Sequence, residues 1–265
     1  MFRSAAAGWL SLLGMLRLRD ARTGSYAMVA SSSVPVRVCV HGPAGGTWSG
    51  LADVRVLLVA DVLTRIVELQ GLQAVTVLAA DSPLPAGLPE DLSALGIHRP
   101  AVLASCEDAA ALLGGPAQVH VARDAPGPGG AGDAVVIGVG PVENLTQPAA
   151  DGNRGDLLAL RLALLSCPYR QPVTLTQAVL ADAAGSAGRW RRRVAEWASQ
   201  PSRPIPADAA AAIRDAFDDD LNTVAALDLL HSVESRPDIP AGAKFETFLF
   251  VDRVLGLEFP REIGH

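Results

Sequence analysis

The sequence predicts an α/β fold in which a parallel sheet is followed by an all-helical half. A strand–helix–strand pattern occupies residues 34–80, and two further strand-like segments follow it before residue 140. The periodic segments after residue 155 all have helical spacing. Because a strand–helix–strand order predicts parallel pairing, we expect an α/β half and then a helical half.

The first of these patterns is the clearest local signal. Val34–Val40 is alternating and β-branched, which predicts a strand, and the glycine-rich segment His41–Thr47 predicts a loop at its carboxyl end. Leu51–Leu69 carries an apolar stripe at helical spacing, and Ala74–Ala80 predicts a second buried strand. A ligand site is expected at the carboxyl ends of these strands, where the glycine loop lies.

The remaining elements follow from the same kinds of pattern. Short helices are predicted at Glu90–Leu95 and Cys106–Leu113, and strands at Gln118–Ala122 and Ala134–Val139. Residues 126–132 and 141–155 are rich in breakers and predict connections. Five long helices are then predicted at Asp156–Ser166, Leu175–Ser199, Ala207–Phe217, Thr223–Val233 and Lys244–Leu255.

Composition narrows the class of protein. With 265 residues, 49% apolar and 19% charged, the chain is neither disordered nor a membrane protein. The net charge of -6 argues against nucleic-acid binding as the main task. Its three cysteines are far apart, which indicates a reduced, cytoplasmic protein. Residues 1–14 are expected to be a leader or a mis-assigned start, because Met15 opens a better beginning.

Lysine is almost missing from the chain. Of the 22 basic residues only Lys244 is a lysine. A phosphate-binding loop that relies on a lysine therefore cannot lie in the α/β half.

The loop after the first strand is the main candidate site. Its backbone N–H groups could bind an anion, and the positive end of the following helix would assist, although a merely flexible turn is an equally good interpretation. The candidate ligand-binding residues are His41, Gly42, Gly45, Gly46, Thr47, Trp48, Gly50, Asp53 and Arg55.

No metal site is predicted, because His41 has no second histidine or acid at ligand spacing. Cys106 and Cys167 lie in apolar helical context and are interpreted as small core residues. Asp218, Asp219 and Asp220 precede Asn222 and Thr223 at a predicted helix start. Carboxylates there favour the helix dipole and a side-chain cap is expected, with paired-carboxylate catalysis or a Ca²⁺ loop as the alternatives.

One dense basic cluster lies in the helical half. It consists of Arg189, Arg191, Arg192 and Arg193, with Trp190 and Trp197 at helical spacing. The cluster could contact RNA phosphates and stack a base, or it could be a solvated helix face with its tryptophans packed inward.

Several ordered segments together suggest a family. Phe217–Leu227 (FDDDLNTVAAL) resembles the "DDDFNTPEAL" signature of cysteinyl-tRNA synthetases, and Leu160–Pro172 (LRLALLSCPYRQP) is similar to their "RYFLLSxHYRxP" segment. Leu16–Thr23 resembles the opening "LYDTxTR", and Val38–Pro43 (VCVHGP) resembles "YVCGPT". Asp61–Gly71 looks like the helix that follows the family's nucleotide signature.

The resemblance implies a class I synthetase fold, with a Rossmann-like nucleotide-type domain over residues 15–150 and a helical bundle domain over residues 151–265. It also implies ATP, cysteine and tRNA as ligands. The family's zinc-binding cysteine falls on His41, with Cys39 two positions earlier, so zinc is not expected. The "HIGH" signature falls on Gly50–Asp53, followed by a matching Arg55, and without an earlier lysine there can be no "KMSKS" loop.

Three functions stay open on the sequence. The leading hypothesis is a degenerate relative of cysteinyl-tRNA synthetase that does not complete cysteine activation and binds a small molecule, cysteine or adenylate-like, or a protein partner near His41–Arg55. The second is an ATP-dependent cysteine ligase with a rebuilt nucleotide site. The third is a tRNA-binding accessory protein that uses the basic cluster.

Overall fold

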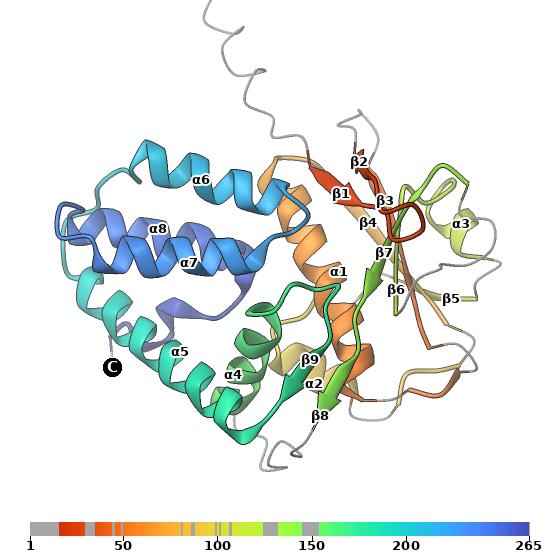
Figure 1. Ribbon diagram of the computed structural model, residues 1–265, viewed down its shortest axis with the longest axis horizontal. Coiled ribbons are helices and arrows are strands. Elements are labelled where there is room, and N and C mark those ends of the chain that lie inside the picture. The colour runs from red at the N-terminus through yellow and green to blue at the C-terminus, as the bar shows by residue number, and fades with distance from the viewer. Residues whose placement is uncertain are drawn as a thin grey trace, which may run out of the picture.

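The protein combines a parallel sheet with a group of helices that lie beside it (Figure 1). The computed structural model describes residues 16–29, 35–43, 46–48, 50–80, 82–85, 88–98, 100, 102–105, 108–123, 132–144 and 154–264. The expected leader at 1–14, Gly45 and Cys106 lie outside the described residues.

The predicted parallel sheet is confirmed and has five strands in the order β5-β4-β3-β6-β7. These strands are β3 (Val36–His41), β4 (Ala74–Ala79), β5 (Val102–Ala104), β6 (Val119–Arg123) and β7 (Val135–Val139). All four neighbouring pairs are parallel. The chain therefore runs outward from β3 to β5 and then returns to place β6 on the other side of β3.

The helix α1 (Leu51–Leu69) joins β3 to β4 and has the bounds that its apolar stripe predicts. Gly50 and Gly71 flank it with φ angles of 72° and 77°, a region that glycine adopts without strain. Two shorter helices follow in the α/β half, α2 (Leu88–Ala94) and α3 (Ala109–Leu112). The second is shorter than the predicted Cys106–Leu113.

Each strand of the sheet presents alternate residues to opposite faces. Val38 and Val40 of β3, with Val121 of β6, belong to the main core beneath α1. The opposite face carries a smaller apolar cluster that includes Cys39 of β3 and Ala109 of α3. Odd and even positions of β3 therefore lie in different environments.

A helical region follows the sheet, as predicted (Figure 1). Its helices are α4 (Arg154–Leu165), α5 (Gln177–Ala198), α6 (Ala207–Asp218), α7 (Thr223–Ser235) and α8 (Ala241–Leu255), with a 3-10 turn η3 (Phe259–Glu262) near the end. Edge-to-face contacts of Trp190 with Phe248 and Phe259 fill the space between α5, α8 and η3.

Two small sheets were not predicted. The antiparallel pair β1 (Arg17–Arg19) and β2 (Tyr26–Met28) precedes the main sheet. The parallel pair β8 (Val142–Asn144) and β9 (Val173–Leu175) joins the end of the α/β half to the segment before α5. A single hydrophobic core includes residues from both halves, so the two halves pack as one body.

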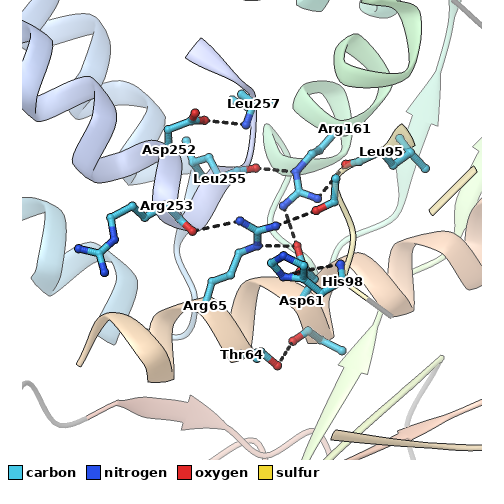
Figure 2. A network of polar contacts seen from close by, with 12 residues as sticks. Asp61, Thr64, Arg65, Leu95, His98, Arg161, Asp252, Arg253, Leu255 and Leu257 are labelled. Atoms are coloured by element: carbon cyan, nitrogen blue, oxygen red, sulfur yellow. Dashed lines mark hydrogen bonds and ion pairs between the residues drawn. The ribbon is translucent and has the colours of Figure 1, made fainter. Parts of the chain in front are cut away.

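Buried charges also connect the halves (Figure 2). Arg161 of α4 is fully buried and donates to the carboxylate of Asp61 on α1 over 2.8 Å. The same guanidinium group donates to the carbonyls of Leu255 and Leu95. Arg65 completes the group with a 2.9 Å bond to Asp61. A buried ion pair of this kind fixes geometry, and removing one member leaves an uncompensated charge.

The acidic run before α7 does more than the helix-start role that was predicted. Asn222 does cap α7, accepting from the N–H of Ala225 over 3.0 Å. Asp220, however, accepts hydrogen bonds from the Tyr169 hydroxyl and from the backbone N–H of Arg19. Asp219 pairs with Arg17. These carboxylates hold β1 and the segment after α4 in place. Among the described residues, no helix is both long and apolar enough to cross a membrane.

Candidate functional site

Two histidines meet on one face of the sheet, near the carboxyl end of β3. His41 is the last residue of β3, and His120 lies in β6, where it pairs in register with Cys39. The His41 Nε2 and His120 Nδ1 atoms are 2.8 Å apart, and the rings stack with centroids separated by 5.1 Å. Both side chains are half-buried.

Their surroundings favour neutral imidazoles. Burial, with the charge of His120 as the second cause, lowers the pKa of His41 to about 4. Burial, with the nearby Arg22, also lowers the pKa of His120. At neutral pH one ring therefore donates the shared hydrogen bond and the other accepts it.

The histidine pair sits where the strand order reverses. The chain leaves β3 toward β4 in one direction and leaves β6 toward β7 in the other. In open parallel sheets a crevice forms outside the carboxyl ends of strands at this point, and ligands bind there. The local topology thus makes the carboxyl end of β3 the best candidate site. His41 lies there, and His120 lies beside it on the same face, nearer the middle of the sheet.

A thiol joins the two imidazoles. Cys39 lies two residues before His41, so both side chains project from the same face of β3, and the register adds His120 to that face. The ligand atoms of the three residues all lie within 4.8 Å of one another. The sequence around His41 does not predict this group, because His120 joins it only through the strand register.

The loop after β3 is held by its own glycines. A side-chain carbon on Gly42 would lie 2.7 Å from the Cβ of Ala80, and Gly46 has a φ angle of 73°. Gly46 also accepts a 2.7 Å hydrogen bond from Ser82. Thr47 is exposed, whereas Trp48 is half-buried, and its Nε1 has no hydrogen-bond partner among the described residues.

Asp53 faces the other side of the sheet from His41. It lies in the first turn of α1, is 4% exposed and forms an ion pair with Arg123 at the end of β6. Arg123 lies two residues after Val121 on β6, so both side chains point to the same face of the sheet. Val121 belongs to the core beneath α1 on that face. The predicted site residues therefore divide between two faces of the sheet.

Arg55 has a different environment from the one expected of a ligand-binding residue. It is 1% exposed, and its guanidinium group donates to the carbonyls of Gly140 and Gln171 over 3.0 and 2.7 Å. Further bonds reach the carbonyls of Pro141 and Pro168. Arg55 thus serves the packing of these loops, because the buried guanidinium group supplies donors to carbonyls that are wholly or partly withdrawn from water.

The basic cluster of α5 is not a continuous exposed surface. Arg191 is buried and donates to the carbonyl of Leu257, whereas Arg192 is exposed. Arg189 pairs with Glu234 and Arg193 with Glu196. Trp190 and Trp197 are 1% and 9% exposed, so their rings pack inward, as the second interpretation of this helix expects, and do not offer a stacking surface.

Comparison with known proteins found no matching family model and no curated protein of significantly similar sequence.

Proposed function

We propose that this chain is a small-ligand-binding module with a class I synthetase-type, Rossmann-like fold, similar to cysteinyl-tRNA synthetase but without cysteine activation. Its ligand, a cysteine- or adenylate-like molecule, would occupy the carboxyl edge of β3 and β6. The observation that carries the proposal is the His41–His120 pair at the point where the strand order reverses.

The architecture supports the family resemblance. The strand order places β4 on one side of β3 and the returning strand β6 on the other, as in nucleotide-binding sheets. In the helical region that follows, Asp219 of the "DDD" segment forms an ion pair with Arg17 of β1. Two motifs of the resemblance therefore meet, although about 200 residues separate them.

The charges around α1 support the loss of activation. A polyphosphate at this helix would meet the carboxylate of Asp53, and the adjacent cation, Arg123, is already paired with that carboxylate. The α/β half has no lysine to supply a second cation. Transition-state stabilisation during adenylate formation depends on such donors, each contributing about 2.7 to 4 kcal/mol.

Two assays test the proposal on the full chain. We expect no cysteine-dependent ATP–pyrophosphate exchange above that of heat-inactivated protein. We also expect saturable binding of a non-hydrolysable cysteinyl-adenylate analogue by calorimetry. His120→Ala should weaken that binding about tenfold, the cost of one strong hydrogen bond, while the exposed-site control His231→Ala should not.

Either of two results would overturn the proposal. Cysteine-dependent exchange above background would establish the cysteine-ligase alternative instead. The absence of measurable binding for the analogue, ATP and cysteine alike would contradict a ligand site at this edge.

A further inference from the structure

We propose that Cys39, His41 and His120 bind a divalent transition-metal ion, with zinc the ion that fits them best, through one thiolate and two imidazole nitrogens. The inference rests on the proposed function for its location, because the ion would lie at the same edge of β3 and β6 as the ligand. It deepens that function by giving the site a metal-binding chemistry.

The sheet itself brings the three donors together. Residues two apart on β3 share a face, and parallel register sets His120 beside Cys39 on that face. Cys39 and His120 enter the set through this register and not through the family resemblance, in which only His41 stands at a metal-ligand position. Among the described residues, this is the one group of three or more histidine, cysteine or acidic side chains close enough together to hold a metal ion.

The spacing suits a tetrahedral ion. Zinc bonds of about 2.0 to 2.1 Å to nitrogen and about 2.3 Å to sulfur place neighbouring ligand atoms about 3.3 to 3.6 Å apart. Here the two imidazole nitrogens are 2.8 Å apart, and all ligand atoms lie within 4.8 Å. To coordinate one ion, the two imidazole nitrogens would move apart by about 0.5 Å, and any longer separation would shorten by up to about 1.5 Å. Small side-chain rotations achieve both changes.

The chemistry of the donors favours a borderline-soft cation. Thiolate and imidazole select zinc and related ions, whereas magnesium and calcium prefer oxygen ligands. Imidazole must be neutral to coordinate, a form that the buried setting of both rings already favours. Cys39 is 3% exposed and the histidines are half-buried, so the ion would be shielded on the sheet side.

Three protein ligands leave a fourth position for another group. Structural zinc sites are usually closed by four protein ligands, whereas sites that act on a ligand keep one position for water or the ligand itself. The proposed ion could therefore take part in binding a small molecule.

Cobalt titration of the full chain, stripped of metal under reducing conditions, tests the inference without any organic ligand. We expect one Co²⁺ per chain, with tetrahedral visible bands and a thiolate-to-cobalt charge-transfer band, and displacement by Zn²⁺. Cys39→Ser should remove the charge-transfer band, and His41→Asn or His120→Asn should weaken affinity by about 100-fold or more. Cys167→Ser and His231→Asn are matched controls and should leave both unchanged.

X-ray absorption of the zinc-loaded wild-type chain covers the case in which a variant fails to fold. One sulfur and two imidazole nitrogens in the coordination shell would support the inference. A shell without sulfur, no stoichiometric cobalt binding, or binding that survives all three ligand substitutions would overturn it. The proposed function is tested separately by analogue binding. If the analogue still binds to fully metal-free protein while the metal results are negative, the metal inference fails and the proposed function stands.

Discussion

At the scale of single residues, Arg55 shows how a cation can be essential without contacting a ligand. Its guanidinium group lies among four backbone carbonyls from the ends of β7 and the segment before β9. The bond to Gly140 is buried and the other three are partly buried, and an unpaired buried acceptor costs about 1 to 3 kcal/mol. Arg55 is therefore expected to act on stability and only indirectly on the site.

Arg55→Met should lower the free energy of unfolding by about 3 kcal/mol or more, because methionine fills part of the space but donates no hydrogen bonds. Urea denaturation measures this loss. Arg192→Met, at an exposed position of α5, should change stability by no more than about 0.5 kcal/mol. Equal effects of the two substitutions would contradict the structural role of Arg55.

Residue-scale prediction from sequence succeeded where local chemistry decides. Asn222 caps α7 as its sequence position indicates, since capping depends only on the next few backbone N–H groups. His41 was predicted as a site residue, but its contacts with Cys39 and His120 were not predicted. The contact with His120 depends on which strand lies beside β3, and a single sequence does not fix that order. Strand parity offers a usable signal, because Cys39 and His41 share a face on any alternating strand.

At the scale of elements, long amphipathic segments were predicted well and short ones were not. The bounds of α1 follow from a sustained apolar stripe ended by glycine. The strands β5, β8 and β9 have three residues each, too few for alternation to be distinguished from chance. Their strand conformation comes from pairing with neighbours that are distant in sequence.

Two glycines in helices should respond in opposite ways to alanine. A side-chain carbon at Gly242, in the first turn of α8, would overlap the carbonyl oxygen of Pro201. Gly242→Ala should therefore destabilise the protein by about 1 to 3 kcal/mol. Gly185 in α5 has open space around it, so Gly185→Ala should stabilise by about 1 kcal/mol through helix propensity. Thermal unfolding compares the two, and destabilisation by both would contradict this packing.

At the scale of the whole molecule, the network around Asp61 and Arg161 joins the sheet half to the helical half (Figure 2). Both side chains are fully buried. Burial by itself would raise the pKa of Asp61, but the hydrogen bond from His98 and the charges of Arg161 and Arg65 hold it at about 2.

This low pKa makes stability depend on acid. Asp61 keeps its charge in the folded state down to about pH 2, whereas in the unfolded chain its pKa is 3.8. The stabilisation is therefore complete above about pH 4 and is lost as pH falls toward 2, a contribution of about 2 kcal/mol. Urea unfolding at pH 4 and pH 2.5 should show a smaller pH effect in Asp61→Asn than in wild type. Asp219→Asn, at a half-exposed pair, should retain most of the wild-type effect. An unchanged pH effect in Asp61→Asn would contradict the assignment.

Histidine ring resonances report directly on where the molecule binds its ligand. The chain has five histidines, and two of them, His41 on β3 and His120 on β6, lie in contact. Ring resonances can be assigned with single histidine substitutions and followed while the cysteinyl-adenylate analogue is added. We expect saturable shifts of the His41 and His120 resonances, with those of His98 and His231 unchanged. Saturable binding that leaves the His41 and His120 resonances in place would contradict this expectation.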